Sequence, residues 1–98
     1  MATGVEIGTL IERESGIRGG RPKIAGTGLT VCRLVGWYKM GMTPEDIALE
    51  YPHLTLAQVH AALAYYHANR EEIEADIAQE EQSAAQWERQ LSSGPKPR

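Results

Sequence analysis

The sequence has little cysteine and no long apolar run, and each absence excludes a class of protein. Cys32 is the one cysteine among 98 residues, which excludes an internal disulfide and a zinc site of clustered thiolates. No run approaches the roughly 18 apolar residues of a membrane-spanning helix. The first residues lack a basic segment followed by an apolar run, so no secretory signal is expected. With 42% apolar and 23% charged residues, we expect a single globular domain in the reducing cytoplasm.

Groups for catalysis or metal binding are also scarce. His53, His60 and His67 are spaced by seven, whereas histidines that share a metal ion on a helix stand three or four apart. Cys32 lies near an expected helix start and is interpreted as a small packing residue. The acidic residues of the C-terminal half fall on one exposed helix without a predicted pocket. We therefore expect no enzyme, no metal site and no cofactor.

Charge is distributed unevenly along the chain. Residues 1–42 carry six basic and three acidic groups, a net charge of +3. Residues 43–98 carry four basic and ten acidic groups, a net charge of −6. Two interpretations stay open: the halves serve two different partners, or the charges form an ordinary solvated surface. The overall charge of −3 argues against indiscriminate coating of nucleic acid.

The pattern predicts a mainly α fold preceded by a short β-hairpin or extended arm. Five glycines between positions 16 and 28 favour turns, and we expect extended pieces over 8–30, with Pro22 on an edge strand. Helices are expected over 30–40, 43–51 and 55–77, each beginning with a threonine cap. The apolar spacing of the third helix continues through an extension over 78–91. We expect the tail 92–98 to be disordered.

The second and third predicted helices are separated by only three residues, which is typical of a helix-turn-helix unit. In such a unit Thr55, Gln58 and His60, at the start of the third helix, would read base edges. Two helices with a short turn also build any trihelical bundle, and this helix has no Arg or Lys before Arg70. Basic groups lie upstream instead, where they would contact phosphate or keep a hairpin soluble; the candidates are Arg18, Arg21, Lys23 and Arg33.

Several motifs resemble, in order, a bacterial family numbered 433 among the domains of unknown function. They are Gly19-Gly20-Arg21-Pro22-Lys23-Ile24-Ala25-Gly26-Thr27, Gly41, Pro44-Glu45-Asp46-Ile47, Tyr51-Pro52-His53-Leu54-Thr55 and the run from Val59 to Tyr66. The resemblance covers about residues 8–77 and implies a homeodomain-like, winged-helix-like fold. One departure is Gly28, where the family usually has arginine.

The resemblance also implies a function. Members are thought to be antitoxins that repress their own operon and neutralise a PIN-like ribonuclease toxin. It implies a homodimer as well, formed through the N-terminal strands, the helices or both. The acidic extension would occupy the toxin as a helix, with Ile73, Ile77, Trp87 and Leu91 in its groove. Trp87 is the main anchor candidate, although it would also suit a contact with its own domain or with a dimer mate.

The leading hypothesis is therefore a dimeric, DNA-binding antitoxin. The alternative is a protein-interaction adaptor whose trihelical core serves dimerisation and which does not bind DNA. The negative net charge and the uncharged start of the third helix favour this alternative.

Overall fold

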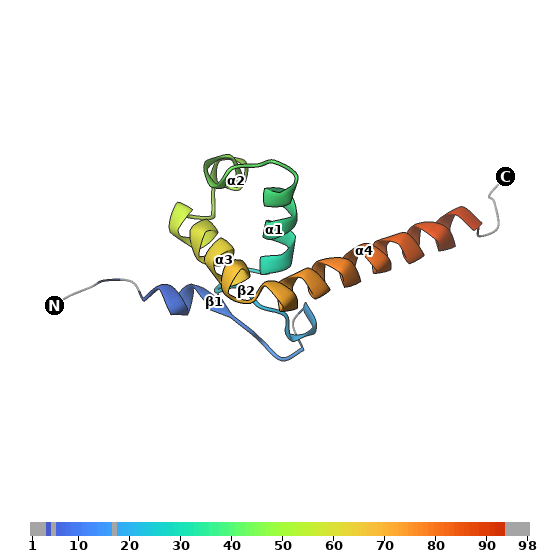
Figure 1. The fold of residues 1–98 in the computed structure, drawn as a ribbon, viewed down its shortest axis with the longest axis horizontal. Coiled ribbons are helices and arrows are strands. Elements are labelled where there is room, and N and C mark those ends of the chain that lie inside the picture. Colours follow the sequence, from blue (N-terminus) through green and yellow to red (C-terminus); the bar gives the residue numbers. More distant parts are fainter. Residues whose placement is uncertain (1–3, 5, 17, 94–98) are drawn as a thin grey trace.

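The computed structural model describes residues 4, 6–16 and 18–93. It is mainly helical, with four α-helices and one short antiparallel strand pair. Helices α1 (Val31–Lys39), α2 (Pro44–Glu50) and α3 (Leu56–Ala68) form the compact part, and α4 (Arg70–Ser93) extends away from it (Figure 1). The extents of 65 × 29 × 23 Å reflect this projecting helix. The predicted fold class is confirmed.

Each helix of the compact part begins at the threonine that the sequence predicts. Thr30 caps α1, and Gly41, at φ +106°, follows its end. Thr43 and Thr55 each form a complete capping box, with Asp46 and Gln58 respectively, and Pro44 occupies the first turn of α2. Side-chain caps satisfy amide groups that a helix start otherwise leaves without partners. They therefore fix where α2 and α3 begin.

The core lies where α1, α2 and α3 meet, and it includes Ile24 of the strand pair. Its fully buried members include Leu34 and Val35 of α1, Ile47 of α2 and Val59 of α3. Trp37 stacks on Tyr51 with ring centroids 4.4 Å apart and planes inclined by 9°. This stack joins α1 to the end of α2, so the helix-turn-helix pair is held against the first helix.

The N-terminal arm contains less strand than expected. Strands β1 (Ile11–Glu12) and β2 (Lys23–Ile24) pair antiparallel, with Ile11 opposite Ile24. The region expected to be extended also contains two 3-10 turns, η1 (Ile7–Leu10) and η2 (Arg18–Gly20). Gly19 and Gly20 both have positive φ, which explains why glycine stands there.

The prediction of one continuous helix from 55 through 77 is wrong, because the helix breaks at Asn69. The Asn69 backbone, at φ −134° and ψ 49°, closes α3. Its side-chain nitrogen donates to the Tyr65 carbonyl at 3.1 Å, the local competition that makes asparagine a poor helix-interior residue. The Asn69 carbonyl then accepts from Ile73 N–H at 3.1 Å. A second helix therefore starts at once in a new direction.

The helical extension expected over 78–91 is the distal part of α4, which runs to Ser93. The prediction of disorder is wrong for Ser92 and Ser93, which are the last residues of α4. The rest of that predicted tail, from residue 94 onward, lies outside the described residues. Among the described residues, no helix is long and apolar enough to cross a membrane.

Candidate nucleic-acid and partner interfaces

The start of α3 presents the predicted base-reading residues. Thr55 and His60 are exposed and Gln58 is half-buried. Thr55 and Gln58 are also the two members of the capping box: Gln58 Oε1 accepts from Thr55 N–H at 2.7 Å, and Thr55 Oγ1 accepts from Gln58 N–H at 3.1 Å. The cap uses the Gln58 carbonyl and leaves its amide nitrogen as the group that can address a base.

Lys23 does not lie where a phosphate contact requires it. Its side chain is only 3% exposed, and its ammonium group lies 2.7 Å from Glu12 Oε2 and 3.0 Å from Glu14 Oε1. It also donates to the Thr27 carbonyl at 2.8 Å. These three partners match the three donors of an ammonium group. The hydrogen bond from Lys23 lowers the pKa of Glu12, and Glu12 raises the pKa of Lys23. The prediction of Lys23 as a phosphate contact is therefore wrong, because its ammonium group is buried and all three of its donors bind partners within the N-terminal arm.

Arg21 is held by three side chains of α4 that lie within about one helical turn of each other. Its Nη1 donates to Glu80 Oε2 at 3.0 Å and its Nη2 to Gln79 Oε1 at 2.7 Å. Its Nε lies 3.6 Å from Asp76 Oδ1. Asp76 Oδ2 is buried without a hydrogen-bond partner, and burial raises the pKa of this carboxyl group. In this conformation the Arg21 guanidinium faces the protein's own helix.

Two further basic residues of the N-terminal half pair with α4. Arg13 donates to Glu72 and, at 3.0 Å, to the Tyr65 hydroxyl. Lys39 lies 2.8 Å from Glu74 Oε2, and Glu74 accepts from the Tyr66 hydroxyl. Sequence reasoning missed both residues. The signal for them was the charge asymmetry itself, since basic side chains of the first half pair with acidic side chains of α4.

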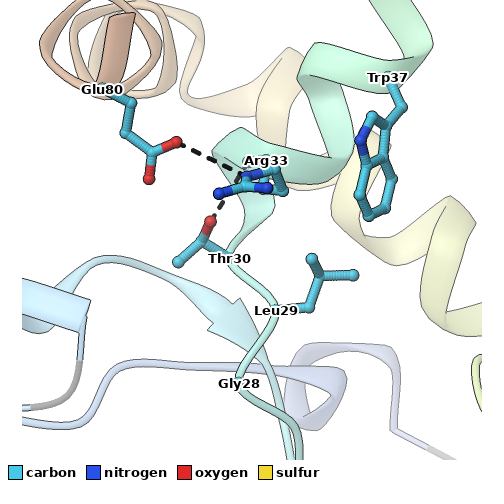
Figure 2. A pocket seen from close by; sticks show the side chains of 6 residues that line it. All are labelled: Gly28, Leu29, Thr30, Arg33, Trp37 and Glu80. Atoms are coloured by element: carbon cyan, nitrogen blue, oxygen red, sulfur yellow. Dashed lines mark hydrogen bonds and ion pairs between the residues drawn. The ribbon is translucent and has the colours of Figure 1, made fainter. Parts of the chain in front are cut away.

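Among the predicted cations whose side chains the structure describes, Arg33 is the most exposed. Its side chain is 61% exposed, and its Nε lies 3.9 Å from Glu80 Oε1, a long ion pair. Arg33 and Trp37 line a hollow of about 140 Å³ beside Gly28 and Glu80 (Figure 2). The side chain of Arg18 lies outside the described residues, so its predicted role stays a prediction.

The four residues predicted to bind a partner divide into two pairs. Ile73 is fully buried and Ile77 packs against the core, so the prediction of Ile73 as a partner anchor is wrong: it attaches α4 to the domain. Trp87 and Leu91 are 62% and 66% exposed. They continue the same helical spacing beyond the domain, and residues 81–91 are all exposed.

Across the part of the chain that the structure describes, no group of three His, Cys, Asp or Glu side chains is placed to hold a metal ion. Burial raises the pKa of the Cys32 thiol, which works against a reactive thiolate.

The fold is thus a mainly α domain with a helix-turn-helix pair, a short N-terminal arm and a projecting helix. The model of the DUF433 family, a protein family of unknown function, matches residues 11–66, and the chain belongs to that family. The match ends within α3, so α4 lies beyond it.

A crystal structure of a DUF433 member from Anabaena variabilis is similar to this chain. The two are 33% identical in sequence, with a TM-score of 0.68. The similarity covers 71% of this chain and 69% of the other. None of the curated proteins compared with the chain is significantly similar to it.

Proposed function

We propose that the protein is the antitoxin of a toxin–antitoxin pair, a dimeric helix-turn-helix protein that represses its own operon and neutralises a PIN-like ribonuclease. The observation that carries the proposal is the form of α4. One half of this helix is part of the domain, and the other half projects with Trp87 and Leu91 exposed. An exposed tryptophan on a preformed helix suits an anchor that becomes buried in a groove of a partner protein.

The toxin-binding surface is the distal stripe, which we define as Ala84, Trp87 and Leu91. The three residues are spaced by three and four and therefore share one side of α4. Ile73 and Ile77 lie on the same side of α4, but they pack against the core and attach the helix to the domain. They are therefore not part of the distal stripe.

The DNA-binding surface is the start of α3 together with Arg33. Thr55, Gln58 and His60 supply hydrogen-bonding groups without charge, so the reading of bases would be direct but weakly supported by electrostatics. Arg33, with its side chain 61% exposed, would contact phosphate.

A second candidate is an adaptor that binds protein but not DNA. It is favoured by the engagement of Lys23 with Glu12 and Glu14 and of Arg21 with α4. DNA phosphate would have to displace those carboxylates from Arg21, and the net charge of −3 gives no general attraction to compensate.

The DNA half is tested by fluorescence anisotropy on the duplex upstream of the gene and on a scrambled duplex, across a salt series. Binding at least about tenfold tighter to the upstream duplex, with a steep salt slope, is the expected result. Arg33→Ala should weaken both complexes and flatten the slope, whereas Gln58→Ala should mainly reduce the preference between them. Equal, weak binding to both duplexes would favour the adaptor.

The toxin half is tested by co-purification with a PIN-like ribonuclease expressed alongside. Trp87→Ala should lower the retained ribonuclease at least tenfold, because it removes the anchor. Gln86→Ala, on the neighbouring exposed residue, is the matched control and should retain it. Equal retention by the two variants would remove the distal stripe from the proposal.

A further inference from the structure

We infer that Gln58 selects guanine, because its capping contact leaves its side chain as a hydrogen-bond donor only. The inference rests on the proposed DNA binding through the start of α3, and it names the base that this helix prefers. A free glutamine side chain carries both a donor and an acceptor, and it pairs with adenine through both groups. In this protein the acceptor already has a partner.

The capping box fixes which atom of the Gln58 amide is the oxygen. The backbone N–H of Thr55 can only donate, so the Gln58 atom that lies 2.7 Å from it is the carbonyl oxygen Oε1. Thr55 Oγ1 closes the box by accepting from Gln58 N–H at 3.1 Å. DNA could use Oε1 only by breaking the cap at the start of α3, which would leave the Thr55 N–H without its partner.

The amide nitrogen Nε2 is the part of the Gln58 side chain that is left for a ligand. Among the described residues no hydrogen bond holds Nε2, and the one buried side-chain nitrogen or oxygen that lacks a partner is Asp76 Oδ2. Nε2 is therefore open to solvent, although Gln58 as a whole is half-buried. It carries two hydrogens and no lone pair that could accept.

The neighbouring side chains at the start of α3 add no carbonyl or carboxylate oxygen. Leu56 is 40% exposed and Ala57 is exposed, and neither has a polar side-chain atom. The Thr55 hydroxyl accepts within the capping box and keeps its hydrogen to donate. The backbone N–H groups of a first helical turn are donors as well. This end of α3 is therefore rich in donors, and it suits a base edge that accepts.

Guanine has the major-groove edge that matches a donor without an acceptor. It presents two acceptors, N7 and O6, whereas cytosine presents an amino donor and thymine one acceptor beside a methyl group. Adenine places an amino donor next to N7, and that donor needs the oxygen which the cap occupies. The first residues of the second helix of a helix-turn-helix unit enter the major groove. Gln58 should therefore favour guanine over adenine, the base that glutamine more often contacts.

Selection of binding sites from a random duplex library tests the inference on the full chain. The variant to compare with wild type is Gln58→Glu, which keeps a side-chain oxygen for the Thr55 N–H and replaces the amide donor by a second acceptor. Wild type should select guanine at one position of its site. Gln58→Glu should select cytosine at that position, because the cytosine amino group donates to a carboxylate. The other positions should keep their bases.

Fluorescence anisotropy on duplexes that differ only at that position measures the preference. Wild type should bind the guanine duplex at least about fivefold more tightly than the adenine duplex. Gln86→Glu, the same substitution at an exposed position of the distal half of α4, is the matched control for the added negative charge and should keep the guanine preference. Thermal unfolding of Gln58→Glu at or above the wild-type temperature checks that the cap is retained.

Two results would overturn the inference while leaving the proposed DNA binding intact. One is a base other than guanine at that position in the wild-type site. The other is the same base selected by wild type and Gln58→Glu, which would make Gln58 a capping residue alone. If Gln58→Glu binds too weakly for selection, the wild-type preference between guanine and adenine decides. A wild type that selects no sequence would overturn the DNA-binding proposal together with the inference.

Discussion

Arg21 and Glu80 stand 59 positions apart in the chain and meet with 3.0 Å between Nη1 and Oε2. This contact spans the charge asymmetry of the sequence, because Arg21 lies in the basic half and Glu80 in the acidic half. The other pairs between the two halves, Arg13–Glu72 and Lys39–Glu74, lie along the same stretch of α4. Exposed pairs of this kind each contribute about 0–1 kcal/mol, so together they orient α4 more than they stabilise it.

The division of α4 into an attached half and a projecting half predicts a contrast between two substitutions. Ile73→Ala should lower the free energy of unfolding by about 2–4 kcal/mol, because it leaves a cavity at a fully buried position. Leu91→Ala should change it by less than about 0.5 kcal/mol, since that side chain is exposed. Urea denaturation of dilute protein, below the dimer range, measures both. Equal losses would mean that the distal half is also part of the core.

Lys23 should matter for stability rather than for DNA. Lys23→Ala removes the link between β1 and β2 and leaves Glu12 and Glu14 facing each other, so the free energy of unfolding should fall by about 1–3 kcal/mol. The salt slope of DNA binding should not change. A stable variant with a flatter salt slope would restore Lys23 as a phosphate contact.

The Lys39–Glu74–Tyr66 cluster predicts a pH dependence on the acidic side. The hydrogen bond from Lys39 lowers the pKa of Glu74, with Tyr66 adding to it. A lowered folded-state pKa means that the stabilisation is present above the unfolded value, near 4.3, and is lost as pH falls through the folded pKa. Glu74→Gln should therefore reduce stability at pH 7 and have less effect at pH 3. Unfolding curves at the two pH values measure the difference.

Local chemistry explains which parts of the fold could be predicted from the sequence. Three helices are capped by threonines that bond to the backbone three residues later, namely Thr30, Thr43 and Thr55. The positions of these helix starts are therefore determined by the local sequence. The break at Asn69 could not be predicted from periodicity, because the spacing of three and four continues through it, with Arg70 at the step between Tyr66 and Ile73. The Asn69 side chain bonds locally to the Tyr65 carbonyl, whereas the direction of α4 follows from partners of Ile73 and of its acidic side chains that lie far away in the chain.

The candidate site shows the same limit. The exposure of Trp87 and Leu91 agrees with the polar composition around them. The burial of Lys23 and the ion pair of Arg21 with Glu80 depend instead on contacts between residues 11 and 59 positions apart. A basic residue beside a glycine turn has the same local signal whether it faces phosphate or a carboxylate. The direction in which α4 runs decides whether Arg21 faces phosphate or a carboxylate of its own chain.

The burial of Ile73 has a consequence for the projecting half of α4. An isolated helix of that length is marginal in water, because its first turn must be formed before any residue can be added to it. In α4 that first turn is already fixed by the domain, so the distal half forms by elongation alone. The folded domain thus serves as a helix nucleus for the distal half. A partner that binds this half does not have to supply the free energy of helix nucleation.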